Sequence, residues 1–442
     1  MGGRTLAIIL AAGQGTRMRS KLPKVMHPVG GLAMVEHVLA AAREAGVDDT
    51  ALVVAPGATW PDAVLARNAG ASAFTQEAQN GTADAVLAAR GAFEGPDVGA
   101  VVVLFGDNPL ITGGTIARVL GAVADGADVA VLGFETAEPY GYGRILRDGD
   151  GQVVAIREEK DATDEERLVT LCNSGVMAIR AGAPLQGLDE IGNDNAKGEF
   201  YLTDIVAIGR ENGWRMVCQE ADFAEVMGVN DRAQLAVAEA EFQRRARARV
   251  MEGATLQAPE TVFFSYDTVI GDDVTIEPNV VFGLGVSVGD GCRVKAFTHL
   301  ENTRLESDVM VGPFARSRGG ASLASGVRIG NFVELKNAQL EAGAKVSHLT
   351  YLGDASVGAG ANIGAGTITC NYDGANKHRT EIGAGAFIGS NSALVAPVVI
   401  GDHAFVGSGS VITDDVPADA LAIARGRQAT KPGRSPAKRE KA

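Results

Sequence analysis

The sequence predicts an α/β domain with a mostly parallel sheet, followed by a parallel β-helix, and two observations carry this prediction. From Thr5 to about Val229, short runs of Val, Ile and Leu alternate with helical patterns. Near-continuous apolar strands separated by helices are typical of a parallel sheet that is covered on both faces. After Gly253 the helical period disappears, and apolar residues recur every six positions, often followed by glycine. This hexapeptide period is typical of short strands that stack into coils.

The N-terminal elements follow one another in the order expected of such a sheet. The predicted strands are residues 6–10, 50–55, 101–105 and 129–132, and a helix is expected at residues 34–45, closed by Gly46. In a sheet of this kind a ligand site lies beyond the carboxyl ends of the strands.

A long helix is predicted between the two parts. Residues 230–252 are rich in helix formers, and four arginines crowd the last turns: Arg244, Arg245, Arg247 and Arg249. Cations there suit the negative end of the helix dipole, so the cluster is interpreted as a solvated helix face. The predicted division is therefore a first domain at 1–229, a linker helix at 230–252 and a β-helix domain at 253–442. Its basic end, from about residue 427, is expected to be a mobile tail.

The period of six can be followed through most of the C-terminal part. The apolar positions are Ile270, Ile276, Phe282, Val288, Val294, Leu300, Leu305, Val311, Leu323, Ile329, Leu335, Val346, Leu352, Ile382, Ile388, Leu394, Ile400, Val406 and Ile412, with a slip of one residue at Leu305. Each should fill the interior of a triangular coil of about eighteen residues. Breaks at residues 315–322 and 369–380 are expected to be loops that leave the coil.

Composition and charge limit the class of protein. The chain has 442 residues, and 40 Lys plus Arg against 54 Asp plus Glu give a formal charge of −14, which argues against a generic nucleic-acid binder. With 46% hydrophobic residues, wholesale disorder is excluded. No apolar run is long enough to span a bilayer, and no signal peptide precedes the first strand, so a cytoplasmic protein is expected. The four cysteines are far apart and form no CxxC, which argues against a disulfide framework or a zinc ribbon.

A glycine turn after the first strand is the first candidate site. It reads Leu10-Ala11-Ala12-Gly13-Gln14-Gly15-Thr16-Arg17-Met18 and is followed by Pro23-Lys24. Backbone N–H groups in such a turn can hold phosphate, and Arg17 and Lys24 add positive charge. Met18 replaces the third glycine of a dinucleotide fingerprint, and no Walker A loop is present. The string resembles the loop with which sugar-nucleotide pyrophosphorylases hold a nucleoside triphosphate.

Asp107 directly follows the strand that ends at Phe105-Gly106. A carboxylate there is well placed to hold Mg²⁺, which prefers oxygen ligands, although Asp107 could equally cap the next element. The amide oxygen of Asn230 is its expected partner in the metal site. Gln76 and Gly81-Thr82 are expected to reach a nucleobase.

The β-helix carries an unusual set of polar side chains within two or three coils. His348 is the candidate base for taking a proton from an amine that attacks a thioester, because histidine titrates in the required range. Arg318 and Lys336 could bind a sugar phosphate, and Tyr351 and Asn362 could orient the sugar. Glu334 could polarise the amine or simply balance Lys336.

Over essentially the whole chain, these strings resemble the bacterial family of bifunctional N-acetylglucosamine-1-phosphate uridyltransferases and glucosamine-1-phosphate N-acetyltransferases. The resemblance implies a Rossmann-like nucleotidyltransferase domain and a left-handed β-helix. It also implies Mg²⁺, the substrates glucosamine 1-phosphate, acetyl-CoA, UTP and N-acetylglucosamine 1-phosphate, and a homotrimer through the β-helix, with acetyl-transfer sites between subunits. The family makes UDP-N-acetylglucosamine for peptidoglycan and lipopolysaccharide.

The resemblance also assigns residues by motif. For UTP and UDP-N-acetylglucosamine they are Leu10, Ala11, Ala12, Gly13, Lys24, Gln76, Gly81, Thr82, Phe105, Gly106, Asp107, Gly143, Glu158, Asn173 and Asn230. For acetyl-CoA or the acetyl-transfer site they are Ala365, Asn371, Tyr372, Ser390, Ser408 and Arg425. Catalysis would rest on His348 in the β-helix, and on alignment and charge neutralisation by Lys24 and Arg17 in the first domain.

At four places the sequence departs from the pattern of the family that it resembles. Gly319 follows Arg318 in place of proline, Ala83-Asp84 replaces Gly-His, Phe105 stands where tyrosine is common, and Gly426 follows Arg425 in place of valine. Two other functions remain open from the sequence. One is another sugar-nucleotide pyrophosphorylase with a regulatory β-helix, and the other is a non-catalytic scaffold of the same folds.

Overall fold

The computed structural model describes residues 3–95 and 97–434, and the chain forms two compact units, Met1–Phe242 and Gln243–Ala442. The boundary falls within one helix, α9 (Arg232–Val250), so this helix contributes residues to both units. Within the described residues, no helix is both long enough and apolar enough to cross a membrane.

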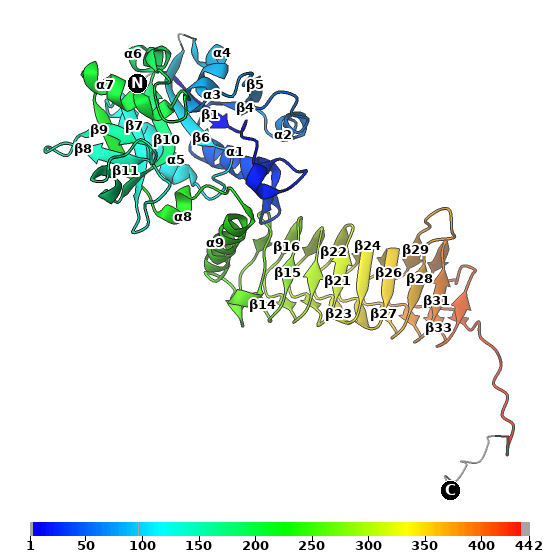
Figure 1. Cartoon of the computed structure of the whole chain (residues 1–442). Coiled ribbons are helices and arrows are strands. Elements are labelled where there is room, and N and C mark those ends of the chain that lie inside the picture. Colours follow the sequence, from blue (N-terminus) through cyan, green and yellow to red (C-terminus); the bar gives the residue numbers. More distant parts are fainter. Residues whose placement is uncertain (1–2, 96, 435–442) are drawn as a thin grey trace, which may run out of the picture. The chain divides into compact units, whose positions relative to one another are not determined.

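The first unit is built on a nine-stranded sheet (Figure 1). Its main path runs β11-β7-β10-β6-β1-β4-β5, and β8 and β9 extend it beside β10. The pairs along this path are parallel except those made by β10, which is antiparallel to β6 and β7. The strands are β1 (Arg4–Leu10), β4 (Asp49–Val54), β5 (Ala71–Thr75), β6 (Val98–Phe105), β7 (Val129–Glu135), β8 (Arg144–Arg147), β9 (Val153–Arg157), β10 (Leu171–Arg180) and β11 (Met216–Glu220), with a small separate pair β2 (Pro28–Val29) and β3 (Leu32–Ala33).

Helices cover both faces of this sheet, as the apolar strands predicted. Alternate residues of one strand belong to different cores: Val103 of β6 packs into one, and Val102 and Leu104 into the other. The α-helices are α1 (Met34–Glu44), α2 (Pro61–Leu65), α3 (Thr82–Ala88), α4 (Arg90–Phe93), α5 (Gly113–Ala124), α6 (Ala183–Gln186), α7 (Ile205–Glu211) and α8 (Phe223–Val226). Short 3-10 turns occur at Thr16–Met18, Lys24–Met26, Glu166–Leu168, Gly187–Glu190, Leu202–Asp204 and, in the second unit, Pro259–Thr261. This arrangement leaves the carboxyl ends of β1, β5 and β6 as the edge on which side chains can meet a ligand.

The second unit is a left-handed parallel β-helix of hexapeptide repeats (Figure 1). One face is a ten-stranded sheet, and a fourteen-stranded sheet forms the remaining faces. The ten strands are β12 (Thr255–Leu256), β14 (Thr275–Ile276), β17 (Arg293–Val294), β20 (Met310–Val311), β23 (Arg328–Asn331), β25 (Lys345–His348), β27 (Asn362–Ile363), β30 (Phe387–Ile388), β33 (Phe405–Val406) and β35 (Leu421–Ala422).

The fourteen-stranded sheet contains two longer strands that turn a corner of the coil, β24 (Glu334–Leu340) and β26 (Tyr351–Val357). Its other members are β13 (Val269–Ile270), β15 (Val281–Phe282), β16 (Val286–Val288), β18 (His299–Leu300), β19 (Thr303–Leu305), β21 (Arg316–Arg318), β22 (Ala321–Leu323), β28 (Ile368–Cys370), β29 (Thr380–Ile382), β31 (Ala393–Val395), β32 (Val398–Ile400) and β34 (Val411–Ile412).

The apolar residues of the period of six fill the interior of the coils. All of those predicted are buried except Ile270, which lies half-buried in one of the first coils. The slip at Leu305 is absorbed without a break, because Leu305 still pairs with Val288 of the preceding coil. A parallel stack of this kind pairs each strand with the equivalent strand one coil away, so residues about seventeen or eighteen apart in sequence become neighbours.

Of the two predicted loops, one is wrong. Residues 315–322 stay in the coil as β21 and β22. Gly319 and Gly320 both adopt positive φ and form the corner between these two strands. The second break is confirmed: β28 ends at Cys370 and β29 begins at Thr380. The loop between them folds on itself through a bridge between Tyr372 and Lys377.

Candidate active sites

A cavity of about 480 Å³ lies at the carboxyl ends of β1 and β6 and just after β5 in the first unit. Ten of the residues predicted to hold the nucleotide line it: Leu10, Ala11, Ala12, Gly13, Lys24, Gln76, Gly81, Thr82, Phe105 and Asp107. The sheet therefore brings together segments that are nearly a hundred residues apart, at the edge where the strand pattern placed the site.

Two glycines make the close packing around this cavity possible. Gly15 has φ 59°, and a Cβ there would lie 2.5 Å from Cβ of Lys24, so only glycine lets the loop after β1 pack on the turn that carries Lys24. Gly106 donates its N–H to the carbonyl of Leu10 at 2.9 Å, and a Cβ there would lie 3.3 Å from Cβ of Ala11. The loop that carries Gly13 is thus held on two sides, with Gly13 itself exposed toward the cavity.

Lys24, Asp107 and Asn230 form one polar cluster. The ammonium of Lys24 is paired with the carboxylate of Asp107 and donates to Oδ1 of Asn230 at 3.2 Å. The main chain holds the two oxygen-bearing residues together, because Val229 donates its N–H to the carbonyl of Asp107 at 2.9 Å. One cation, the ammonium, is thus within reach of both oxygens. The donor set, a carboxylate and an amide oxygen, fits a hard divalent ion whose remaining ligands come from phosphate and water.

A second group of predicted residues lies together beside β8, β9 and β10. Asn173 donates its N–H to the carbonyl of Gly143 at 2.8 Å, and a Cβ on Gly143 would lie 3.4 Å from Oε1 of Glu158. Burial raises the pKa of the Glu158 carboxyl, and a hydrogen bond from Thr203 (3.2 Å) opposes that rise. Gly143 therefore lies next to both Glu158 and Asn173, and Asn173 is buried, with its Oδ1 accepting the N–H of Gly175 at 3.0 Å. Thr203 was not predicted, since its role depends on how the turn Leu202–Asp204 packs.

The end of the cavity after β5 is built from three linked groups. The side-chain amide of Gln76 donates to the carbonyl of Gly81 at 3.0 Å and to Oδ2 of Asp84 at 2.7 Å. Asp84, in the first turn of α3, also accepts from the N–H of Asn80 at 3.1 Å. Gln79 and Glu199 line the cavity as well, and neither was predicted. The amide of Gln79 donates to the carbonyl of Ala12 at 2.8 Å, which ties this end of the cavity to the glycine loop.

Arg17 is placed differently from the other predicted residues. It is exposed on the 3-10 turn Thr16–Met18, on the loop that follows Gly13, and it does not line the cavity. Its guanidinium therefore has freedom to move toward an anion, which a residue locked in an ion pair does not have.

In the second unit, His348 ends β25 and is oriented by the preceding coil. Its Nδ1 lies 2.6 Å from Oδ1 of Asn331, its register partner on β23. Because an amide oxygen only accepts, Nδ1 carries the proton in this contact and Nε2 presents its lone pair. That tautomer is the one a general base requires. Asn331 was not predicted as a site residue, although it lies seventeen residues before His348, one coil away.

Four of the residues assigned to acetyl-CoA continue from His348 in a row along the β-helix. Main-chain hydrogen bonds link the row from coil to coil: Gly366 to His348 (3.2 Å), Asn391 to Ala365 (2.7 Å) and Gly409 to Ser390 (2.8 Å). The guanidinium of Arg425 then donates to the carbonyl of Ser408 at 2.6 Å. With strands about 4.8 Å apart, four steps span roughly 19 Å. The row is therefore an extended track with the candidate base at one end and a cation at the other.

A cationic cluster lies on the strands of the fourteen-stranded sheet. Arg318 and Lys336 are register partners, and the guanidinium of Arg318 is paired with the carboxylate of Glu334 at 2.8 Å. This ion pair raises the pKa of Arg318. Lys377, on the loop after β28, lies close enough to Lys336 to lower the pKa of its ammonium. Two ammonium groups that repel each other form a site that an anion would stabilise, and Lys377 was not predicted.

Tyr351 and Asn371 meet over Gly353. A Cβ on Gly353 would lie 2.4 Å from the Tyr351 hydroxyl and 2.8 Å from Nδ2 of Asn371, so a side chain there would displace both groups. The amide of Asn371 donates to Asp354, which also accepts from Asn337 at 2.7 Å. Asn362 lies on β27, the strand that follows that of His348 in the ten-stranded sheet, and so shares a face with the base rather than with Lys336. Tyr372 is exposed on the loop, and its hydroxyl donates to the carbonyl of Gly374 at 2.6 Å.

The tail predicted to be basic and mobile is described only in part. Lys431 and Arg434 are exposed, whereas Lys438, Arg439 and Lys441 lie outside the described residues.

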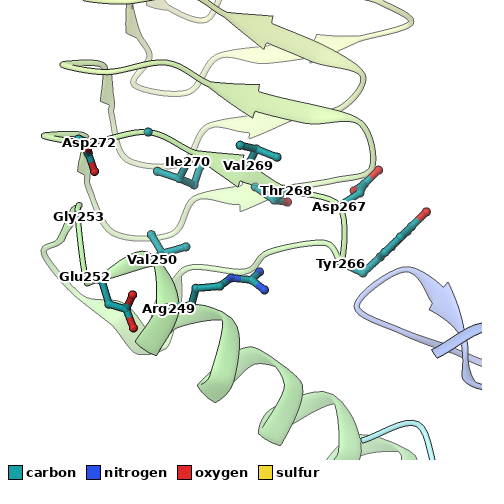
Figure 2. A pocket seen from close by; sticks show the side chains of 11 residues that line it. Arg249, Val250, Glu252, Gly253, Tyr266, Asp267, Thr268, Val269, Ile270 and Asp272 are labelled. Atoms are coloured by element: carbon teal, nitrogen blue, oxygen red, sulfur yellow. The ribbon is translucent and has the colours of Figure 1, made fainter. Parts of the chain in front are cut away.

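A further cavity of about 550 Å³ lies in the second unit between the end of α9 and the first coils (Figure 2). Arg249, Glu252, Asp267 and Asp272 supply its charged side chains. None of the predicted site residues lines it.

Comparisons with known proteins agree with both parts of the chain. Residues 7–166 match the MobA-like NTP transferase domain, and residues 267–302 and 379–414 match the bacterial transferase hexapeptide family of six repeats. The "Bifunctional protein GlmU" of Agrobacterium fabrum is 56% identical over 99% of this chain and 97% of its own length. The proteins of the same description from Azorhizobium caulinodans and Xanthobacter autotrophicus are each 58% identical, over 97% of this chain and 96% of their own length. The chain belongs to the GlmU family of bifunctional proteins, which confirms the family expected from the sequence.

Proposed function

We propose that the chain makes UDP-N-acetylglucosamine in two steps, each on its own unit. The β-helix transfers an acetyl group from acetyl-CoA to the amine of glucosamine 1-phosphate. The α/β unit then transfers a uridylyl group from UTP to the resulting N-acetylglucosamine 1-phosphate. We assign the second step to residues 1–229 and the first to residues 253–442, with the helical segment 230–252 between them.

The row from His348 to Arg425 is the observation that carries this proposal. A pyrophosphorylase with a regulatory β-helix has no need of an oriented base at one end of a row of binding residues on its coils. Here Nε2 of His348 is presented as an acceptor because Asn331 holds Nδ1.

Acetyl transfer requires a free amine, a base and a seat for the sugar phosphate. The amine nitrogen attacks the thioester carbonyl, its proton passes to Nε2 of His348, and the C–S bond breaks as the histidine returns the proton to the leaving thiolate. Arg318, Lys336 and Lys377 offer the positive charge for the phosphate group, and Tyr351 and Asn371 offer hydrogen bonds beside it. Acetyl-CoA would lie along Ala365, Ser390, Ser408 and Arg425.

Uridylyl transfer joins two anions, so alignment and charge neutralisation are the main requirements. An oxygen of the sugar 1-phosphate attacks the α-phosphorus of UTP and pyrophosphate leaves. The loop around Gly13 and the ammonium of Lys24 hold the phosphates, with Arg17 free to approach them. Gly143, Glu158 and Asn173 orient the sugar. Asp107 and Asn230 would hold Mg²⁺, which neutralises phosphate charge when bound.

We also propose that the chain forms a homotrimer through the β-helix and that it lies in the cytoplasm. A cytoplasmic location agrees with an enzyme that takes soluble nucleotide and CoA substrates.

Mass spectrometry of the products tests the proposal. The purified full chain is incubated with glucosamine 1-phosphate, acetyl-CoA, UTP and Mg²⁺, and we expect UDP-N-acetylglucosamine, pyrophosphate and free CoA. Uridylyl transfer without release of CoA would favour a pyrophosphorylase with a regulatory β-helix. Binding of UTP and CoA without turnover of either would favour a non-catalytic scaffold.

A further inference from the structure

The side-chain amide of Gln76 has only one chemically acceptable orientation. Gln76 is 5% exposed and follows β5 at the nucleotide cavity. Its nitrogen faces the carbonyl oxygen of Gly81 at 3.0 Å and a carboxylate oxygen of Asp84 at 2.7 Å. Both partners are acceptors only, so a flipped amide would set its own oxygen against two other oxygens.

Both acceptors are themselves held in place. Gly81 has φ 129°, and a Cβ there would lie 2.5 Å from the carbonyl oxygen of Phe200, so its main chain is closely packed. Asp84 is half-buried in the first turn of α3, and its Oδ2 also accepts from the N–H of Asn80 at 3.1 Å. The two N–H groups of the Gln76 amide therefore point at two acceptors whose positions are fixed.

The consequence is that the carbonyl oxygen of Gln76 is the polar atom left for a ligand. Within residues 3–95 and 97–434, no group donates a hydrogen bond to this Oε1. An acceptor at this position needs a donor opposite it. Uracil presents a ring N3–H, whereas cytosine presents a lone pair at N3.

We propose that Asp84 is a specificity-determining positioning residue, which fixes the Gln76 amide so that its carbonyl oxygen reads the ring N–H of uracil and rejects cytosine. The inference rests on the proposed uridylyl transfer and adds to it the residue that sets the pyrimidine choice. Asp84 acts through Gln76.

The test compares UTP with CTP as substrates of the full chain, with N-acetylglucosamine 1-phosphate and Mg²⁺, by the ratio of the two kcat/KM values. In Asp84→Ala one N–H of the Gln76 amide loses its acceptor, and only the carbonyl of Gly81 still opposes rotation of the amide. We expect the UTP-to-CTP ratio to fall about tenfold, the size of one charge-assisted hydrogen bond. The change should appear mainly in KM, because the base is held equally in the ground state and the transition state.

Two further variants separate positioning from mere folding. Asp84→Asn keeps an acceptor oxygen of the same reach, so its ratio should stay close to that of the unchanged chain. Asp84→Ser keeps an oxygen near Asn80 but is too short to reach Gln76, so its UTP-to-CTP ratio should fall as in Asp84→Ala. This variant provides the test if Asp84→Ala folds poorly. Acetyl transfer by the same preparations, which depends on the other unit, reports whether each variant is folded.

The outcomes distinguish this inference from the function on which it rests. If the unchanged chain does not turn over UTP, the proposed uridylyl transfer fails. If it does so but uses CTP equally well, or if Asp84→Ala and Asp84→Ser slow both nucleotides to the same extent, the role of Asp84 is refuted and uridylyl transfer stands.

Discussion

At the residue scale, Asn331 decides which nitrogen of His348 can act as the base. Its side-chain oxygen lies 2.6 Å from Nδ1, so Nε2 presents the lone pair. In Asn331→Ala the histidine loses this partner and both its tautomer and its ring orientation become mixed. We expect kcat for acetyl transfer to fall roughly tenfold to a hundredfold, less than in His348→Ala, as measured by thiol release from acetyl-CoA.

Uridylyl transfer provides the internal control for this prediction, because its groups lie in the other unit. An Asn331→Ala protein that keeps full acetyl transfer would mean that His348 is oriented by the substrate instead.

Thr203 adjusts the charge on a second predicted residue, Glu158. Burial raises the pKa of Glu158, and the hydroxyl of Thr203 donates to it at 3.2 Å and so favours the charged form. As the pH falls, Glu158 is neutralised earlier than an ordinary glutamate, and it then accepts sugar hydroxyls less well. Thr203→Val removes the donor, so the pKa of Glu158 rises further and the acid side of the uridylyl-transfer profile moves to higher pH.

The measurement is kcat/KM for N-acetylglucosamine 1-phosphate across the acid range, for the unchanged chain and for Thr203→Val. Thr203→Ser, which keeps the hydroxyl, should restore the original profile. A Thr203→Val profile that moves to lower pH, or does not move, would show that Glu158 is not the group that titrates.

At the element scale, the coils of the β-helix tolerate side chains at some glycines and not at others. A Cβ on Gly330 would lie 1.9 Å from the carbonyl oxygen of Ser347 in the next coil, a main-chain atom that cannot turn aside. Gly343 has open space around it but adopts φ 68°. Gly330→Ala must therefore push two coils apart, whereas Gly343→Ala adds only backbone strain.

We expect Gly330→Ala to lower the free energy of unfolding by about 3 kcal/mol, and Gly343→Ala by less, about 1–2 kcal/mol. The melting temperature and the loss of acetyl transfer on heating measure both effects. Equal destabilisation by the two substitutions would mean that the coil spacing yields easily at Gly330.

The same elements show what could be predicted from the sequence. The apolar period placed the interior of the coils correctly because it depends only on which side chains face inward. The loop predicted for residues 315–322 is wrong because the apolar period is interrupted there, whereas the chain stays in the coil with Ser317 buried and two glycines forming the corner. Asn331, Thr203 and Lys377 were missed because each acts on a residue from another coil or turn, and a single sequence does not show which turns meet.

At the scale of the whole molecule, the two proposed sites use different units and exchange a small diffusible product. Asp107→Ala should abolish uridylyl transfer and leave acetyl transfer intact, because Asp107 pairs with Lys24 and accepts the N–H of Val229, both of which belong to the first unit. His348→Ala should do the reverse. Each variant alone then yields no UDP-N-acetylglucosamine from glucosamine 1-phosphate, acetyl-CoA and UTP.

A mixture of the two variants should restore the product. The Asp107→Ala protein releases N-acetylglucosamine 1-phosphate, and the His348→Ala protein consumes it after diffusion through solution. Because the intermediate must first accumulate to the KM of the second step, product formation should begin after a lag that shortens as the Asp107→Ala protein is increased. If each variant retains its single activity but the mixture forms no product, the intermediate is passed between sites without release, and the two units act as one catalytic assembly.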